Sequence, residues 1–366
     1  VSQAKEVLGG MGIQTAATGD VLIKKVVFRT VVPFVEAEET EPLSISSDGL
    51  TVRLAGDFPR VLDYSLNGKT LNGAELRYNY VTINTVDYPA TAVAEPAEDG
   101  KSVTYHVTPE GSGVTFDVVF TVLDDQILEM RINNIVEPEG EQVNSITLPR
   151  QPLISANSGQ EGAKFGAAWM DKNDWAFRDI HETIADRNVS TTADRTVIIP
   201  IISANGLSAA MTNNVYIDGD EFRYRAFELP DGEVSVGVWN TDFMYRGLDD
   251  EKILPFASEP DEADLYCRVV ITEDNNGDGV TDWQDGGNAL RNKLVGDQIP
   301  GGDEAARTFF HVGYNFASGA QQPFLKVADN MKRLSNYMDG FGQTLIFKGY
   351  ANEGHDSGHA DYNDIN

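Results

Sequence analysis

The sequence predicts a mainly β protein, in which a large antiparallel β-sandwich precedes the start of an α/β domain. Two observations carry this prediction. Between about residues 20 and 270, short β-type runs alternate with turn dipeptides, and helical periodicity is almost absent. After residue 285 the apolar spacing becomes helical, and a strand, a helix and a second strand then follow one another.

The expected strands of the sandwich are rich in β-branched and aromatic residues with alternating polarity. They are LTVRLAG, RVLDYSL, SVTYHVT, GVTFDVVFTVLD, ILEMRINNI, RTVIIPII and EVSVGVWN. Four dipeptides supply the positive φ angles that tight hairpins require: Asp48-Gly49, Asn67-Gly68, Asp99-Gly100 and Asp231-Gly232.

The α/β segment begins after a break in the chain. Apolar residues at helical spacing predict a short helix after residue 285, and the residues Ile299 to Gly302 (IPGG) then end it. We therefore expect one domain over residues 1–298, which ends in this short helix, and a second over residues 299–366.

The second domain is expected to open with a βαβ unit. Residues 308–316 and 343–350 read as strands, and Pro323 opens a helix that Gly340 is well placed to end. The apolar positions of this helix are Phe324, Ala328, Met331, Leu334 and Met338. Short connections make the two strands parallel, as in the first strands of a (β/α)₈ barrel.

Composition excludes several classes of function. The sequence contains 28 Lys and Arg residues and 57 Asp and Glu residues, which gives a formal charge of −29. Lys and Arg form no basic stripe. We therefore expect no nucleic-acid partner. The single cysteine, Cys267, allows neither an intrachain disulfide nor a Cys-based zinc site. No run approaches 18 uncharged apolar residues, so we expect no membrane insertion. Together these features favour a secreted or cell-surface bacterial protein.

The strongest motif is DNNGDGVTDWQD, which starts at Asp274 and has the spacing of an EF-hand or dockerin calcium loop. A glycine at its sixth position, Gly279, permits the sharp turn of such loops. Calcium requires six to eight oxygen ligands, and the loop positions that supply them are 1, 3, 5, 7, 9 and 12. The predicted Ca²⁺ ligands are Asp274, Asn276, Asp278, Val280 through its carbonyl, Asp282 and Asp285. The alternative is an acidic surface turn.

Two further groups of residues suggest ligand binding. The segment GYANEGHDSGHADYNDIN directly follows the second parallel strand, where barrel enzymes build their active sites. Its residues alone leave open a metal site, a substrate clamp or a solvated acidic loop. The second group could form a sugar platform, although tryptophans in a β domain more often belong to the core. It comprises Trp169, Asp171, Asp174 and Trp175.

Four segments together resemble the endo-α-N-acetylgalactosaminidases of glycoside hydrolase family 101. They are FPRVLDYSLNGKTLNG, NGDGVTDWQDGGNALR, FASGAQQPFLKVADNMKRL and DGFGQTLIFKGYANEGHDSGHADYNDI. The resemblance implies a sandwich similar to galactose mutarotase, followed by a (β/α)₈ catalytic barrel. It implies a retaining enzyme that releases Galβ1-3GalNAc from Ser or Thr of mucin-type O-glycoproteins.

The family's catalytic aspartate and glutamate lie on later barrel strands, so the resemblance implies no catalytic residue before Asn366. It does assign the galactosyl end of the substrate to a His-Asp pair, which corresponds to His355 and Asp356 here. Two other functions remain open at this point. One is a non-catalytic, calcium-stabilised carbohydrate-binding module. The other is a mutarotase-like epimerase, which would need a catalytic histidine, and the sandwich offers only His106 and His181.

Overall fold

The computed structural model describes residues 34–140, 142–171, 176–214, 222–246, 265–295, 308–315 and 321–349. The chain divides into two compact units, Val1–Gly287 and Asn288–Asn366. The domain boundary expected between residues 298 and 299 lies outside the described residues.

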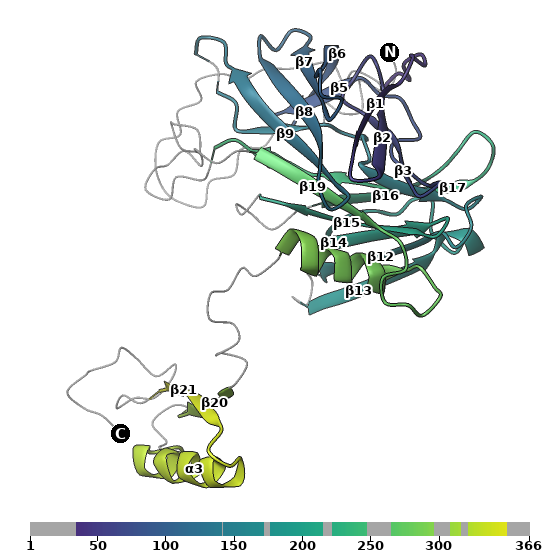
Figure 1. The fold of residues 1–366 in the computed structure, drawn as a ribbon. Helices are drawn as coiled ribbons and strands as arrows, with labels where there is room; N and C mark the ends of the chain where they lie inside the picture. The colour runs from purple at the N-terminus through teal and green to yellow at the C-terminus, as the bar shows by residue number, and fades with distance from the viewer. Residues whose placement is uncertain are drawn as a thin grey trace. The chain divides into compact units, whose positions relative to one another are not determined.

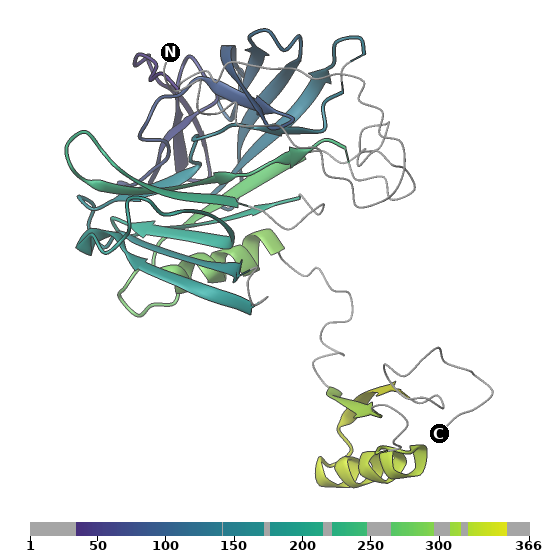
Figure 2. The same ribbon diagram turned by 180° about the vertical axis from the view of Figure 1, so that it is seen from behind.

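The first unit is built from antiparallel strands in continuous hydrogen-bonded order, curled into layers (Figure 1, Figure 2). The predicted antiparallel β architecture is therefore confirmed. The strands are β1 (Leu43–Ser47), β2 (Leu50–Leu54), β3 (Val61–Leu66), β4 (Lys69–Asn72), β5 (Tyr80–Ile83), β6 (Val86–Pro96), β7 (Ser102–Pro109), β8 (Thr115–Leu123), β9 (Ile127–Val136), β10 (Ser145–Thr147), β11 (Ile154–Asn157), β12 (Lys164–Asp171), β13 (Ala176–Thr183), β14 (Asp194–Ala204), β15 (Leu207–Asn213), β16 (Phe222–Glu228), β17 (Val234–Asn240), β18 (Phe243–Met244) and β19 (Leu265–Thr272).

Alternating polarity places the core between the layers. Along β8 the buried positions alternate with partly exposed ones, as expected for a strand with one face in the core. Phe165 of β12 and Tyr224 of β16 stack in this core with ring centroids 4.5 Å apart. Burial of large aromatic rings of this kind supplies much of the stabilisation of such a domain.

Two of the predicted hairpin turns adopt the expected backbone conformation. Asp48 and Gly49 both have positive φ angles (49° and 80°), and so do Asn67 and Gly68 (52° and 78°). These are the conformations of a type I′ turn, and the turns connect β1 to β2 and β3 to β4.

Strand β14 passes from one sheet to another. Its first residues pair with β16, and its later residues pair with β12 and β15. The chain bends between these two regions at Ile199, which has a φ of 50° and precedes Pro200. A β-branched residue is strained in this conformation, so the bend is held by pairing on both sides.

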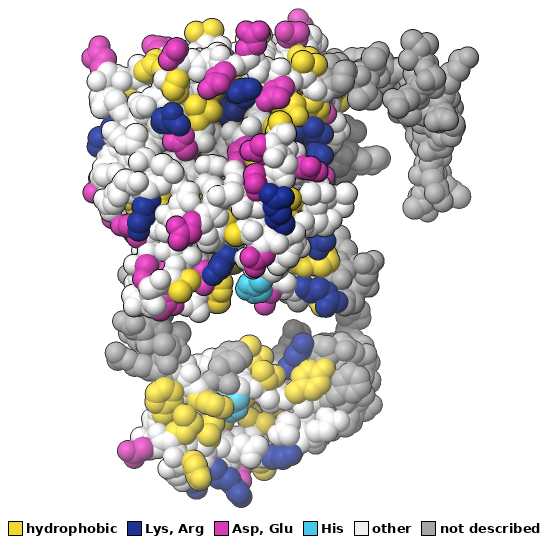
Figure 3. All heavy atoms as spheres, turned by 90° about the vertical axis from the view of Figure 1, so that its right-hand side faces the viewer, with side chains coloured by type: hydrophobic (Ala, Val, Ile, Leu, Met, Phe, Trp, Pro, Cys, Tyr) yellow, Lys and Arg dark blue, Asp and Glu magenta, His cyan; other side chains and the backbone are white. Residues whose placement is uncertain are grey.

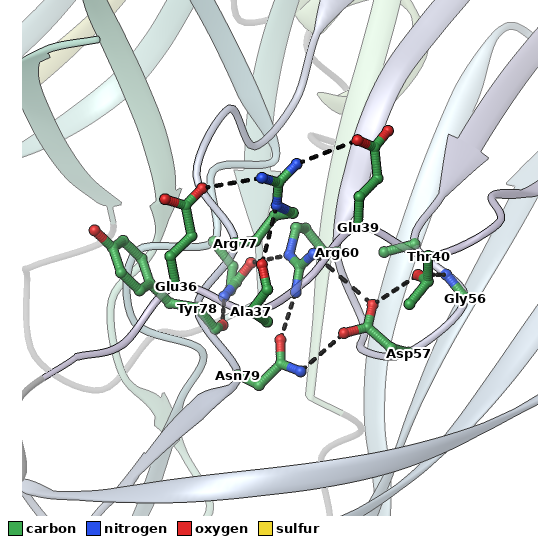
Figure 4. A network of polar contacts seen from close by, with 12 residues as sticks. Glu36, Ala37, Glu39, Thr40, Gly56, Asp57, Arg60, Arg77, Tyr78 and Asn79 are labelled. Carbon is green, nitrogen blue, oxygen red and sulfur yellow. Dashed lines mark hydrogen bonds and ion pairs between the residues drawn. The ribbon is translucent and has the colours of Figure 1, made fainter. Parts of the chain in front are cut away.

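A polar network fixes the chain that enters the first strand (Figure 4). Arg77 forms ion pairs with Glu36 and Glu39 at 3.5 and 3.6 Å. Beneath it, the guanidinium group of Arg60 is only 1% exposed and donates hydrogen bonds to Asn79 and Gln151. The segment around residue 37 is therefore fastened to the sandwich by the ion pairs of Arg77 and by its hydrogen bonds with the backbone of Ala37.

The second unit contains a parallel pair of strands and a helix, so the predicted βαβ unit is confirmed. Strand β20 (Thr308–Tyr314) pairs in parallel with β21 (Gly342–Lys348), and helix α3 (Phe324–Tyr337) connects them. Gly340 adopts a φ of 77° after the helix, as expected for a residue that ends it.

The apolar stripe of α3 differs in one turn from the expected one. Val327, which the prediction omitted, is the buried residue, whereas the predicted positions Phe324 and Ala328 are exposed. Met331, Leu334 and Met338 are partly buried, as expected. Several large apolar side chains of this unit are exposed, and they gather on the face seen in Figure 3.

The visible face of the first unit carries intermingled acidic and basic side chains (Figure 3). No helix in the described part of the chain is long and apolar enough to cross a membrane.

Candidate functional site

The predicted calcium loop, residues 274–285, lies between β19 and helix α1 (Trp283–Ala289). A π-helical turn, η3 (Leu290–Val295), continues α1. The loop therefore leaves a central strand of the sandwich and ends in the first turn of a helix.

In the first half of the loop, side-chain oxygens accept hydrogen bonds from the N–H groups of the loop's own backbone. Both carboxylate oxygens of Asp274 accept N–H hydrogen bonds, from Gly277 at 2.7 Å and Gly279 at 2.9 Å. Asn276 accepts from the N–H of Asp278, and Asp278 accepts from that of Val280, each at 2.9 Å. These hydrogen bonds between side chains and backbone form short turns. The turns bend the loop so that its positions 1, 3 and 5 lie along one curve.

The second half of the loop forms a reciprocal cap on α1. Asp282 accepts from the N–H of Gln284 at 3.0 Å, and Asp285 accepts from the N–H of Asp282 at 3.0 Å. This resembles a capping box with aspartate at the third helical position, but the Asp282 carboxylate accepts from the second helical N–H and not from the third. Asp285 is fully buried and also accepts N–H bonds from Asn275 and Asn276, at 2.9 and 3.3 Å. Its carboxylate thus joins the two ends of the loop.

The donor set fits calcium by its chemistry, because carboxylate, amide and carbonyl oxygens are the ligands that this ion prefers. The side chains are not gathered around one point in this conformation. No group of three or more His, Cys, Asp or Glu in the described ranges is placed to hold a metal ion. The Asp285 carboxylate already accepts hydrogen bonds from three backbone N–H groups. The other loop oxygens would therefore have to move toward a cation for it to bind.

The loop is anchored to the sandwich at both ends. Glu273, just before the loop, accepts bonds from Lys69 at 2.6 Å and Asn67 at 2.7 Å, which lower the pKa of Glu273. At the other end, Ser208 donates to the carbonyl of Asp282 at 2.9 Å. The α1 backbone packs so closely that a Cβ on Gly286 would lie 2.5 Å from the Ile201 side chain. The loop and the start of α1 therefore contact β4, β14 and β15.

Comparison with known proteins identifies the family of this chain. Residues 45–283 match the model of a galactose mutarotase-like fold domain, and residues 284–366 match that of the endo-alpha-N-acetylgalactosaminidases. A putative endo-alpha-N-acetylgalactosaminidase of Renibacterium salmoninarum is 32% identical over 347 residues, or 87% of this chain. The chain belongs to glycoside hydrolase family 101. It spans 22% of the length of that relative.

Two solved structures match this chain at low similarity. An α-N-acetylgalactosaminidase from Bifidobacterium bifidum gives a TM-score of 0.45 at 13% identity, covering 88% of this chain and 54% of that one. An aldose epimerase homologue from C. elegans gives 0.36 at 10% identity, covering 64% and 99%.

Within this family 101 chain, the residues that the resemblance assigns to substrate lie outside the described part. His355 and Asp356 both fall in residues 350–366, as do the other polar residues of that segment. The assignment of these two residues therefore remains a prediction.

The proposed sugar platform is only partly described. Trp169 is partly buried against the core, and the Arg195 guanidinium lies 4.7 Å from the centre of its ring. This contact indicates that Trp169 packs in the sandwich and carries no evidence for sugar binding. Asp174 and Trp175 lie outside the described residues.

The two histidines of the sandwich do not resemble an epimerase centre. His106 lies on the outer face of β7 with 49% of its side chain exposed, and both ring nitrogens already have carboxylate partners. His181 lies beside Trp283, with ring centroids 6.0 Å apart. Nothing in these surroundings supports acid-base chemistry on a bound sugar.

The His106 cluster gives a testable pH dependence. The hydrogen bonds that the His106 ring donates to the carboxylates of Glu95 and Asp117 raise the pKa of His106 above its usual 6.5. The protonated form is favoured in the folded state, so this contribution is full below about pH 6.5 and disappears as the pH rises through the folded-state pKa. We expect His106→Gln to lower the melting temperature more at pH 6 than at pH 8.5.

The measurement is thermal unfolding at both pH values, together with an NMR titration of the imidazole. In the matched variant Asp117→Asn, the titration of His106 should move to lower pH. An equal loss of stability at both pH values would contradict the ion-pair explanation.

Sequence reasoning missed the polar residues that gather around the buried Arg60. Arg60, Asn79 and Gln151 are far apart in the chain and join only in the folded protein. The one available signal is an arginine set between Phe58 and Val61 in an otherwise apolar run. It identifies an unusual position without identifying its partners.

Proposed function

We propose that this chain is the sandwich and the opening barrel elements of a retaining endo-acting glycosidase. Its reaction would release Galβ1-3GalNAc from Ser or Thr of mucin-type O-glycoproteins. The observation that carries the proposal is the match of residues 284–366 to the endo-alpha-N-acetylgalactosaminidase model, supported by the relative of that name.

The proposed roles follow the chemistry of a retaining glycosidase. Such an enzyme needs two carboxyl groups about 5 to 5.5 Å apart across the scissile bond, one as nucleophile and one as acid/base. We assign neither role to a residue of this chain, which spans 22% of its relative. Asp356 and His355 would instead hold the terminal galactose, with the carboxylate accepting from vicinal hydroxyls and the imidazole donating to an oxygen.

A charge-removing substitution tests this role in the complete polypeptide. Asp356→Asn keeps the shape of the side chain and removes its charge. A hydrogen bond to a charged group contributes about 1.5 to 3 kcal/mol, so we expect kcat/KM for an aryl Galβ1-3GalNAc glycoside to fall roughly tenfold to a hundredfold. Melting temperature and calcium response should be unchanged.

An aryl α-GalNAc glycoside is the matched substrate, since it lacks the sugar that Asp356 is proposed to hold. Turnover of this substrate should be insensitive to the substitution. Unchanged kinetics on the disaccharide would indicate a solvated loop residue, and a loss rescued by excess divalent metal would indicate a metal site. A complete protein that binds the disaccharide without cleaving it would favour the carbohydrate-binding module.

We further propose that the loop at residues 274–285 binds Ca²⁺ and stabilises the junction between β19 and α1. The support is the spacing of its oxygen donors and their anchorage to the sandwich. Asp274, Asn276 and Asp278 would contribute side-chain oxygens and Val280 its carbonyl, with Asp282 acting directly or through a water. Calcium would act by ordering the fold and would take no part in bond cleavage.

A secreted or cell-surface location is also part of this proposal. The excess of acidic residues suits such a location, and so does a protein whose single cysteine, Cys267, is buried and takes no part in a disulfide.

A further inference from the structure

The outward face of the first four strands forms an open groove of about 470 Å³. Its lining comes from β1, β2, β3 and β4 and contains no apolar residue. The lining residues are Ser44, Thr51, Arg53, Asp63, Ser65, Thr70 and Asn72. The volume lies within the range of small-ligand sites, which is about 300 to 1,000 Å³.

Strand register brings these side chains into rows. Arg53 lies opposite Asp63, and Asp63 lies opposite Asn72. A parallel row runs from Thr51 through Ser65. Because side chains alternate between faces, the residues in between are in the core. They are Ile45, Val52, Tyr64 and Leu71, each no more than 2% exposed.

The lining is electrically neutral as a whole. Its two charges form an ion pair in which the Arg53 Nε donates to both oxygens of Asp63, at 2.9 and 3.0 Å. The other five side chains are hydroxyls and one amide. In a chain with a net charge of −29, a neutral groove of this size is a distinct environment. It offers no net attraction to an anion or a cation and many hydrogen bonds to a neutral ligand.

One end of the groove is held in place by neighbouring strands. The Nδ2 of Asn72 donates to Glu75 at 3.1 Å, and Asn157 and Ser235 donate to the same carboxylate. This fixes the orientation of the Asn72 amide, and with it the direction of its carbonyl oxygen. A preoriented acceptor reduces the ordering cost of binding.

We propose that this groove binds a neutral oligosaccharide. Hydroxyl and amide side chains both donate and accept hydrogen bonds, which matches the hydroxyl groups of sugars. The groove lacks an aromatic ring on which a sugar could stack, so binding is weak and depends on hydrogen bonds. The inference goes beyond the proposed hydrolysis, because it concerns recognition by the sandwich and does not depend on turnover.

The test is an NMR titration of the 366-residue chain with methyl Galβ1-3GalNAc. The reporters are the Arg53 Nε–H and the Asn72 side-chain amide, both of which lie in the groove. We expect saturable shifts of these signals. In Thr51→Tyr, where a bulky ring fills the centre of the groove, the affinity should fall at least about tenfold through lost hydrogen bonds. The matched control is Thr104→Tyr on β7, which should bind like the wild type.

Three results would overturn the proposal. The first is the absence of saturable shifts at these reporters. The second is equal affinity in Thr51→Tyr and the wild type. The third is tighter binding of a galacturonate disaccharide than of the neutral one, since a neutral lining gives no reason for it. Loss of binding in Asp356→Asn, with Thr51→Tyr unaffected, would place the observed binding in the substrate loop instead. Failure of hydrolysis by the complete enzyme would leave the groove result intact.

Discussion

Replacing Arg60 by alanine is expected to destabilise the sandwich by about 3 to 5 kcal/mol. The side chain is 1% exposed, and burial lowers its pKa. It lies 3.8 Å from Asp57 and donates to Asn79 and to Gln151. Removal leaves a cavity and deprives the buried amide oxygen of Gln151 and the partly buried amide oxygen of Asn79 of their donor, and both effects lower the stability.

The measurement is urea unfolding of the wild type and the variant, compared at constant slope. Arg53→Ala is the matched control, because its ion pair with Asp63 is at the surface and should contribute no more than about 1 kcal/mol. Arg60→Met separates packing from polar pairing, since it restores volume without a donor. If Arg60→Met were as stable as the wild type, Arg60 would stabilise the sandwich by its packing and not by its hydrogen bonds.

Calcium binding to the loop at residues 274–285 is expected to raise the free energy of unfolding by an amount similar to the loss expected for Arg60→Ala. For a dissociation constant of about 1 μM, a free calcium concentration of 1 mM stabilises the folded chain by about 4 kcal/mol. We expect a chelator to lower the melting temperature and magnesium to restore little of it. Trp283, at the tenth loop position and 48% exposed, provides a fluorescence signal for the titration.

Two loop variants distinguish metal binding from folding. Asp278 is exposed and hydrogen-bonds within the loop, so Asp278→Ala should abolish the calcium response and leave stability in chelator near that of the wild type. Asp285→Asn should lower stability even in chelator, by about 1 to 3 kcal/mol, because a buried acceptor of three N–H groups is altered. Glu110→Ala controls for the loss of one surface charge. No calcium response in the wild type would refute the metal-binding prediction.

Local sequence rules accounted for the elements and several turns. The positive φ angles at Asp48 and Gly49, the alternating burial of β8 and the parallel pairing of β20 with β21 all follow from residue patterns within a few positions. The family resemblance likewise rested on contiguous segments, and the comparisons confirmed it.

The same rules did not predict how Asp285 is used. Spacing gave it the role of a calcium ligand, whereas its buried carboxylate accepts three backbone N–H groups in this structure. Spacing identifies which oxygens can reach a point, but burial and competing donors determine where each one lies. Its part in metal binding remains a prediction.

The sequence by itself determined the β-sandwich, the βαβ unit, the loop motif and the family, because each depends on short-range periodicity or on contiguous motifs. Only the tertiary structure decided which strands became neighbours, as when β11 took its place between β4 and β17. It also gathered Arg60 with Gln151, 91 residues away. These arrangements depend on strand order and register across the whole sheet. No local pattern specifies which distant strand will pair with the free edge of a given strand.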